Sequence, residues 1–290
     1  MKIIILFFSL FLFFSSCVKR ISDPSWVEIS EWELLANSNL GSLEGALSHN
    51  FSDAWVYADG QLVGVFELPV KFPMLKEGTT VFTILPTILN NGIAATKKAY
   101  PFVQPYEVTV TLIKNKTIII NPVTKHNDNV KFWIEDFEES TIKFEPDLGT
   151  SLASLVQAND PSILKYGNYY GHIALNSIDS IYAGYSLETQ GLVLPNKGAE
   201  VYLEIDYHST NTLITGLIEH SPTTVQYHPN IQINGQDESS VVWKKIYIDL
   251  KEIVSGTSSS EYYKVSFIAQ LNAGGVTRDI IIDNIKVLYR

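Results

Sequence analysis

The chain has 290 residues and a formal net charge of −10, with 31 acidic side chains against 21 Lys and Arg. This balance excludes a nucleic-acid-binding protein that depends on a basic face, because phosphate recognition needs clustered cations. It also argues against an anionic membrane surface as the main partner. Cys17 is the single cysteine, so no intramolecular disulfide can form and the fold must hold by core packing.

An apolar segment stands at the start of the chain. Residues 3–14 read IIILFFSLFLFF, follow Lys2 and precede the small pair Ser15-Ser16. A basic start, an apolar middle and small residues are typical of a secretory signal peptide, which we place at residues 1–16. The apolar run is too short for a transmembrane helix, which needs about 20 residues.

The residues before the cysteine resemble a bacterial lipobox. Phe14-Ser15-Ser16-Cys17 matches it in a loose form, with Phe at the third position before Cys. The resemblance implies that Cys17 becomes the mature N-terminus and carries fatty acyl chains such as palmitate, which together form a stable membrane anchor. The alternative is an ordinary secreted protein with an incidental cysteine.

The residues after Cys17 bear on the destination of the protein. Val18 stands where an Asp would resemble an inner-membrane retention signal, so we expect the outer membrane. This N-terminus resembles the surface lipoproteins of Bacteroidota, but they carry an acidic cluster after the cysteine, whereas residues 18–23 hold only Asp23. The sequence leaves open whether the protein faces the cell surface or the periplasm.

Residues 17–50 are mixed in character, and we expect a lipid-anchored linker there. From residue 51 the pattern changes to short β-prone runs, of which DAWVYA and QLVGVFE are joined by Asp59-Gly60. Asp-Gly between such runs predicts a hairpin, because a type I′ turn needs positive φ at both central residues. Alternation in YEVTVTL, residues 106–112, predicts a strand with one polar and one apolar face.

The stretch 51–124 resembles the PEGA-type β-sandwich modules of bacterial surface proteins. The matching residues are VYADGQLVG at 56–64 and LKEG at 75–78, which leads into a Thr/Val strand. The resemblance implies a spacer or a binding platform. The chain departs from the PEGA pattern at an insertion, residues 86–105. The end of this insertion contains Tyr100 and Phe102 together with Pro101 and Pro105, and Tyr106 follows it directly. These rings form either a contact patch for a partner protein or a cover over the sandwich edge.

Residues 122–130, NPVTKHNDN, are polar and mark the domain boundary. After them turn signals separate nine β-prone runs, which predicts a sandwich or a jelly roll over residues 131–290. In AEVYLEIDY, residues 199–207, we expect Tyr202, Glu204 and Asp206 on a solvent-exposed face, as in an antiparallel sheet. The predicted strands are 132–138, 142–145, 171–176, 182–189, 199–207, 213–219, 242–250, 262–271 and 278–288.

Four stretches of this second domain resemble the galactose-binding-like jelly rolls, which include many carbohydrate-binding modules. They are FWIEDFE at 132–138, YGNYYGHIAL at 166–175, WKKIYIDL at 243–250 and IIIDNIKV at 280–287. The whole chain is therefore predicted to be all-β, with two β-sandwich domains after a lipoprotein signal peptide, the second a jelly roll. The resemblance implies a sugar-binding, protein-contacting or structural role.

A sugar site would need flat aromatic rings for the C–H faces of a pyranose and a few oriented polar groups for its hydroxyls. Tyr207-His208 and Tyr227-His228 lie near predicted strand ends, where loops would place them on a rim. The alternative for each ring is core packing, which we favour for Trp243. The candidate ligand-binding residues are Tyr169, Tyr170, Tyr207, His208, Tyr227 and His228, with His220 considered beside them.

The jelly-roll resemblance also implies a structural calcium between the first and last strands. Glu138 and Asp283 are the candidate ligands, with Glu135, Asp136 and Asp279 in the same strands, because Ca²⁺ takes six to eight oxygens. The alternative is hydrogen bonding between paired terminal strands. His208, His220 and His228 are a further candidate set for a transition metal. No other cofactor is expected.

Asp179-Ser180-Ile181 resembles the site at which Bacteroidota O-glycosylate exported proteins, which implies a modified Ser180. No Gly-x-Ser-x-Gly elbow, His-Glu-x-x-His motif, phosphate loop or dinucleotide fingerprint occurs. The sequence favours a non-catalytic outer-membrane lipoprotein, not an enzyme, whose jelly roll binds a glycan or cell-envelope polymer. One alternative is a structural accessory lipoprotein of an outer-membrane transport, secretion or gliding assembly. The other is a hydrolase with a pair of carboxylates.

Overall fold

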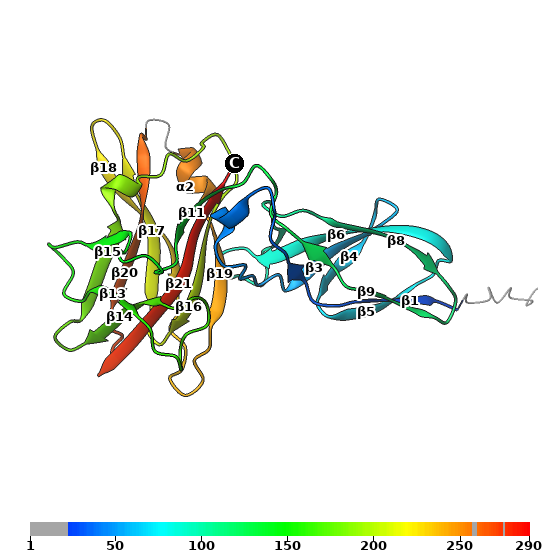
Figure 1. The fold of residues 1–290 in the computed structure, drawn as a ribbon, viewed down its shortest axis with the longest axis horizontal. Helices are drawn as coiled ribbons and strands as arrows, with labels where there is room; N and C mark the ends of the chain where they lie inside the picture. The colour runs from blue at the N-terminus through cyan, green and yellow to red at the C-terminus, as the bar shows by residue number, and fades with distance from the viewer. Residues whose placement is uncertain (1–22, 257–259, 275) are drawn as a thin grey trace, which may run out of the picture.

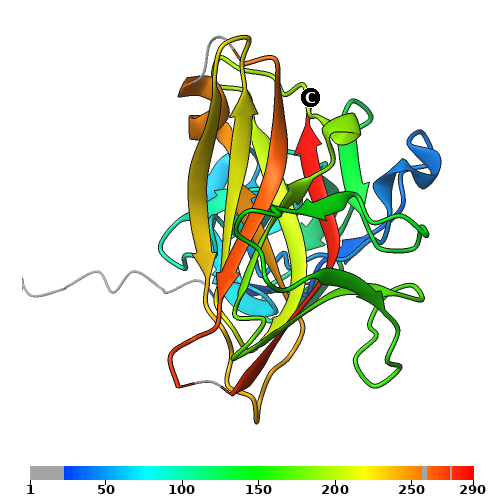
Figure 2. The same cartoon turned by 90° about the vertical axis from the view of Figure 1, so that its left-hand side faces the viewer.

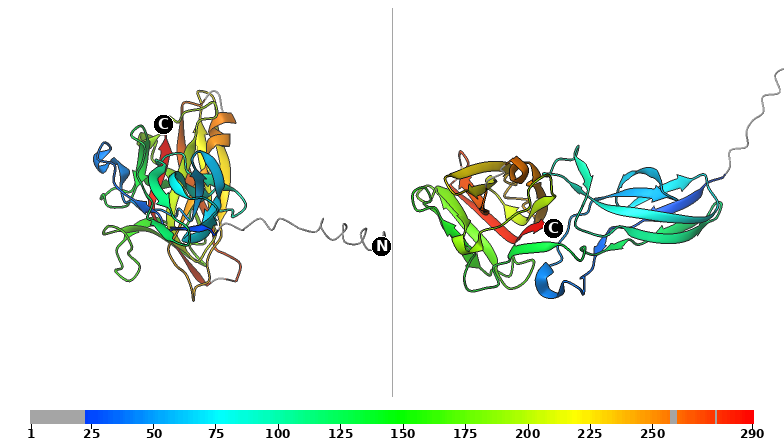
Figure 3. Two further views of the ribbon diagram at one scale, coloured as in Figure 1. Left: turned by 90° about the vertical axis from the view of Figure 1, so that its right-hand side faces the viewer. Right: turned by 90° about the horizontal axis from the view of Figure 1, so that it is seen from above.

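A computed structural model describes residues 23–256, 260–274 and 276–290. Figure 1 shows two β-rich domains side by side along the long axis, the N-terminal one in blue and cyan and the C-terminal one in green to red. The described chain begins at the far tip of the N-terminal domain, and its C-terminus lies near the junction of the domains (Figures 1 and 3). Cys17 lies outside the described residues. Within them, no helix is long and apolar enough to cross a membrane.

The N-terminal domain is a β-sandwich. A three-stranded sheet of order β5-β1-β9 packs against a five-stranded sheet of order β4-β3-β6-β7, in which β8 also pairs with β6; a short β10-β2 pair completes the domain. The strands are β1 Ser25–Ile29, β2 Glu33–Leu34, β3 Asp53–Ala58, β4 Gln61–Glu67, β5 Val70–Met74, β6 Gly78–Leu89, β7 Lys97–Ala99, β8 Tyr106–Leu112, β9 Thr117–Ile120 and β10 Val123–Thr124.

Local sequence patterns account for much of this domain. The predicted hairpin joins β3 to β4, and Asp59 and Gly60 have φ values of 49° and 78°. The alternation predicted for β8 is confirmed by its burial, because Glu107, Thr109 and Thr111 are exposed while the intervening residues are partly buried. The insertion at 86–105 begins with the last residues of the long strand β6 and contains β7.

Part of the expected linker belongs to the sandwich. Strand β1 pairs antiparallel with β5 and parallel with β9, and Val27 and Ile29 on its inner face are fully buried. The alternation SWVEI is only five residues long, so it cannot be distinguished from a short helix by periodicity alone. The partners that make it a strand lie more than 40 residues away in the sequence.

The C-terminal domain is a jelly roll. The six-stranded sheet has the order β13-β14-β21-β16-β19, with β11 also paired to β21, and the five-stranded sheet has the order β12-β15-β20-β17-β18. The chain passes repeatedly from one sheet to the other. The strands are β11 Lys131–Glu135, β12 Phe144–Pro146, β13 Leu155–Ala158, β14 Tyr170–Asn176, β15 Ile181–Ser186, β16 Val201–Ser209, β17 Leu213–His220, β18 Val225–Ile233, β19 Lys244–Asp249, β20 Tyr262–Gln270 and β21 Thr277–Tyr289.

Nine of these strands correspond to the predicted ones, and two were not predicted. Strand β18 contains Pro229, which cannot donate to a ladder, and it lies at the edge of its sheet, where proline is tolerated. Strand β13 is a four-residue edge strand. The core lies between the two sheets and includes the fully buried Leu203, Ile205 and Phe267. Short 3₁₀ turns at Gly41–Glu44 and Glu188–Gln190 and the helix α2, Lys251–Gly256, are the described helical segments.

Candidate functional site

The outer face of the six-stranded sheet is covered by the N-terminal domain. Tyr202, Glu204 and Asp206 alternate with core residues along β16, as predicted, but all three are buried, with at most 3% of each exposed. The expectation that this face meets solvent is therefore wrong. Alternation placed these residues on one face of the strand, but the segment around residues 44–51 and the insertion at 86–105 pack over that face.

The aromatic rings of the insertion provide this cover. Tyr100 is 3% exposed and Phe102 is fully buried, and both lie edge-to-face against Tyr202 with centroids 5.6 and 6.0 Å apart. Tyr247 of β19 packs against Tyr100 and Phe51. These rings are thus the intramolecular domain interface and do not form the contact patch that we considered for a partner protein; Tyr106 of β8 is partly buried against the same core.

Backbone contacts at the junction protect a sheet edge. Strand β19 is the edge of the six-stranded sheet, and Asn90 forms an isolated parallel bridge with Tyr247 of β19. The Asn91 amide donates to the Tyr247 carbonyl at 2.9 Å, and the Asn91 side chain accepts from the amide of Asp249 at 2.8 Å. Because an unpaired strand edge is a template for aggregation, this pairing closes the jelly roll on that side.

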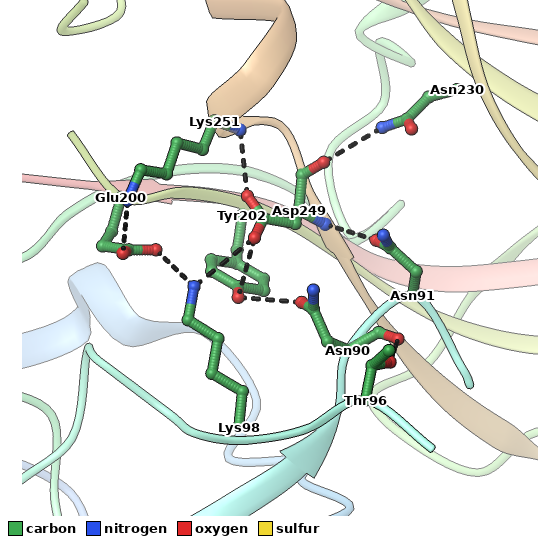
Figure 4. Close-up of polar contacts among 9 residues, drawn as sticks. All are labelled: Asn90, Asn91, Thr96, Lys98, Glu200, Tyr202, Asn230, Asp249 and Lys251. Atoms are coloured by element: carbon green, nitrogen blue, oxygen red, sulfur yellow. Dashed lines mark hydrogen bonds and ion pairs between the residues drawn. The ribbon is translucent and has the colours of Figure 1, made fainter. Parts of the chain in front are cut away.

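A polar cluster continues the junction beside this edge (Figure 4). The Lys98 ammonium lies between Glu200 at 2.9 Å and Asp249 at 3.4 Å. The Tyr202 hydroxyl donates to Asn90 at 2.8 Å, and it lies 3.2 Å from Asp249. Burial opposes the shift, but Glu200, the Tyr202 hydroxyl and Asp249 together hold the pKa of Lys98 above its usual value.

Charged groups are buried beneath the insertion. The Lys245 ammonium lies 2.9 Å from Glu204 and 3.7 Å from Asp206, and Glu204 also accepts a hydrogen bond from the Tyr100 hydroxyl. Ser48 donates to Asp206. Burial alone would raise the pKa of Glu204, but the ammonium groups of Lys245 and Lys286 outweigh burial and lower it. The Lys245–Glu204 ion pair is therefore ionised and shielded from water.

Lys286 is the second buried cation of the junction. Its ammonium donates to the backbone carbonyls of Glu44 and Ala46. Burial, reinforced by the positive charge of Lys245, lowers the pKa of Lys286 to about 8. Glu44 in turn pairs with His126 at 2.6 Å, and burial lowers the pKa of that imidazole. The ion pairs of Lys98, the hydrogen bonds of Lys286 and the ring packing therefore hold the two domains against each other.

Two adjoining cavities, about 480 and about 530 Å³ in volume, open at the junction beside the first residues of β19. We call them together the interdomain groove. Both are lined by Tyr207, Lys244, Ile246 and the backbone of Gly92. The first cavity is also lined by Tyr166 and Trp243 of the jelly roll and by His49 and Asn50 of the N-terminal domain.

Two residues considered in the sequence, Tyr207 and Trp243, line this groove, and a third, His208, adjoins it. Tyr207 lines both cavities, and His208 follows it with its ring 5.8 Å from that of Trp243. Trp243 is only partly buried, so the expectation of a core tryptophan is wrong. Its indole N–H donates to the carbonyl of Ile163 at 2.7 Å, which holds the ring at the groove wall.

The outer face of the five-stranded sheet, which we call the distal sheet, carries a second aromatic surface. Tyr227 is 39% exposed, and its ring lies directly over Gly216, where a Cβ would be 2.7 Å from the ring carbon Cε2. The Lys264 ammonium lies 4.2 Å from the centroid of the Tyr185 ring. It also pairs with Glu145 at 3.2 Å.

The remaining predicted ligand residues do not join either surface. Tyr170 is buried, and Tyr169 packs partly against the jelly-roll core. His228 pairs with Glu219 at 2.8 Å. These rings therefore take the core or paired positions that we weighed as the alternative.

The predicted metal ligands are held by hydrogen bonds. Glu138 accepts the backbone amides of Asn168 and Tyr169 and the side-chain amide of Asn168. Asp283 is buried at a cavity of about 240 Å³ that Glu138 and Asp136 also line, and burial raises its pKa to about 8. Among the described residues, no three His, Cys, Asp or Glu side chains lie together in a group that could hold a metal ion. These carboxylates thus do not assemble a calcium ligand set, although Asp136, Glu138 and Asp283 are neighbours.

The three histidines considered for a transition metal do not converge. His220 stacks on Tyr262 with centroids 4.4 Å apart, His228 pairs with Glu219, and His208 lies beside Trp243. That hypothesis is therefore wrong. Ser180 lies in the turn between β14 and β15, partly exposed, where its carbonyl accepts the amide of Leu271; its glycosylation stays a prediction.

Sequence reasoning missed several residues of both surfaces. His49, Asn50 and Gly92 reach the groove from loops of the other domain, and no local pattern marks them. Tyr262 and Lys264 could have been found, because in YYKVSFIAQ they alternate with the core residues of β20.

No family model matches the chain, and no curated protein matches it. Solved structures do match. The CBM22-2 xylan-binding domain of Xyn10C from Paenibacillus barcinonensis is 12% identical, with a TM-score of 0.39, over 55% of this chain and 99% of that chain. The C-terminal family 22 carbohydrate-binding module of Xyn10B from Clostridium thermocellum is 11% identical, with a TM-score of 0.38. That match covers 54% of this chain and 92% of the module.

A further structure, described as one of the carbohydrate-binding modules from the β-sandwich superfamily, is 16% identical with a TM-score of 0.38. That match covers 80% of this chain and 83% of the other.

Proposed function

We propose that this protein is a non-catalytic lipoprotein of the outer membrane that binds a glycan or cell-envelope polymer through its distal sheet. The lipobox-like Phe14-Ser15-Ser16-Cys17 supports the anchor. The two domains hold the distal sheet away from that anchor, because the described chain starts at the opposite end of the molecule (Figure 1).

The observation that carries the proposal is the position of the Tyr227 ring. Gly216 has no side chain, so the ring lies down on the sheet in contact with it and remains 39% exposed. A ring laid on a rigid sheet offers a preformed surface for the C–H face of a pyranose. Figure 2 views the jelly roll from the side of this sheet, with the N-terminal domain behind it.

Polar groups beside the ring would orient a sugar. Lys264, Glu145 and Glu188 form a charged cluster next to Tyr185 on the same face. Sugar hydroxyls donate hydrogen bonds to carboxylates, and the solvent-accessible Glu145 and Glu188 side chains supply such acceptors, whereas the Lys264 ammonium between them is buried. The stacked rings of His220 and Tyr262 adjoin this cluster, because the Tyr262 hydroxyl donates a hydrogen bond to Glu188.

The test is glycan-array binding followed by titration calorimetry on residues 18–290, a chain that retains every described residue. Tyr227→Ala should weaken binding about tenfold or more, since a ring contact contributes on the order of 1–1.5 kcal/mol beyond its buried area. Tyr227→Phe, which keeps the ring, should bind as the wild type does. Tyr57→Ala in the N-terminal domain is the matched control. A wild-type chain that binds no glycan, or a Tyr227→Ala variant with full affinity, would overturn the proposal.

A further inference from the structure

The interdomain groove is a second, separate candidate site. It lies at the junction on the N-terminal side of the jelly roll, whereas the distal sheet forms the opposite face (Figures 1 and 2). Its walls come from both domains: His49, Asn50 and Gly92 from one, and Tyr166, Tyr207 and Trp243 from the other. The groove therefore exists only while the domains are joined.

Three rings give the groove flat apolar surfaces. Tyr166 and Trp243 line the first cavity, and Tyr207 lines both. The hydrogen bond from Trp243 to the Ile163 carbonyl and the adjacent His208 ring fix the indole in place. A wall that is already ordered loses little entropy when a ligand stacks on it.

The cations of the groove are unusual for this chain. In a protein with ten more acids than bases, Lys165 and Lys244 line the groove and form no ion pair within the described residues, although Asp206 and Asp237 also line it. Lys165 lies only over the Tyr166 ring, 5.2 Å from its centroid. Lys245, the third lysine of the wall, is neutralised by Glu204 and Asp206.

A polar donor completes the wall. Tyr207 packs partly against the jelly-roll core but also lines both cavities; its hydroxyl has no hydrogen bond in the described chain, and Lys244 is its direct cross-strand neighbour in the β16–β19 register. The uncommitted ammonium and hydroxyl therefore adjoin each other beside the aromatic rings. An anionic group placed there would gain charge-assisted hydrogen bonds, which are stronger than neutral ones.

We propose that the interdomain groove binds an acidic saccharide, with a carboxylate or sulfate of the sugar paired to Lys244 and Lys165 and its pyranose ring stacked on Trp243 or Tyr207. A neutral sugar would use the rings alone. A small free anion would use the lysines alone and gain nothing from the aromatic walls.

The test uses residues 18–290 and two kinds of probe. Oligosaccharides of galacturonate, glucuronate-containing and sulfated units are titrated calorimetrically, and oligogalacturonate is compared with its neutral methyl ester. At least one acidic oligosaccharide should bind, about tenfold more tightly than its uncharged counterpart, and its affinity should fall as NaCl rises because exposed charges are screened. Trp243 fluorescence should change on binding.

Variants assign the site. Lys244→Gln should lower the affinity about tenfold, and Trp243→Ala should abolish the fluorescence change. Lys116→Gln, at an exposed lysine of the N-terminal domain without an ion pair, is the control and should have no effect. Tyr227→Ala should also leave this binding intact, which separates the groove from the distal sheet.

Three results would overturn the proposal. The first is that no acidic oligosaccharide binds more tightly than its neutral counterpart. The second is that Lys244→Gln binds as tightly as Lys116→Gln. The third is that Tyr227→Ala removes the acidic-sugar binding, which would place it on the distal sheet.

Discussion

Replacing Lys245 with Met tests the charged network of the jelly roll that the N-terminal domain buries. The substitution keeps the apolar stem of the side chain and removes the ammonium that lies 2.9 Å from Glu204 and 3.7 Å from Asp206. At an effective dielectric constant near 20, these distances correspond to gross attractions of roughly 6 and roughly 4 kcal/mol. Desolvation offsets much of this, but removal of one partner leaves buried carboxylates uncompensated, which costs about 3–5 kcal/mol.

Urea unfolding of residues 18–290, followed by tryptophan fluorescence at pH 7, measures this loss. Lys251→Met is the matched control, because Lys251 pairs with Glu200 at 3.1 Å but is partly exposed, and such pairs contribute about 0–1 kcal/mol. Adding Glu204→Gln to Lys245→Met should recover part of the stability. If Lys245→Met costs no more than the control, the reasoning that this network is dry and ionised is wrong.

Three further predictions concern the junction and the anchor. Phe102→Ala should lower the free energy of unfolding by about 3–5 kcal/mol, because this fully buried ring packs between the domains; a loss below ~1 kcal/mol would contradict that packing. The Lys286 pKa, about 8 when folded, lies below its unfolded value, so the unfolded chain binds more protons between pH 8 and about 10.4 and stability should rise with pH across that window. Lys286→Met should remove this rise in paired urea titrations, and equal slopes for both proteins would refute it. Cys17→Ala should release the protein from the membrane fraction, and unchanged retention would refute lipidation.

The all-β architecture followed from short-range patterns. Alternation in β8, β16 and β20 reflects the two-residue period of a strand, and Asp59-Gly60 fixes a tight turn through backbone conformation alone. These signals depend on adjacent residues, so a sequence reveals them directly. Strand β18 escaped because Pro229 is tolerated only at an edge, and the edge is defined by the other strands.

The residues of the candidate sites could be predicted less well from such local patterns. Tyr227 was predicted as a ligand residue because it lies near a strand end, but its exposure depends on Gly216 of the neighbouring strand. Tyr170 was also a candidate ligand residue, and it is buried. A ring at a strand end can turn inward or outward, and packing against distant residues decides which.

The sequence by itself determined that this chain forms two β-rich domains, and it predicts a lipid anchor at Cys17. Only the tertiary structure decided that the polar face of β16 is dry, that Tyr100 and Phe102 bind the chain's own second domain, and that Trp243 lines a groove. The physical reason is that alternation specifies which side chains share a face of a strand, whereas whether that face meets water depends on what folds over it.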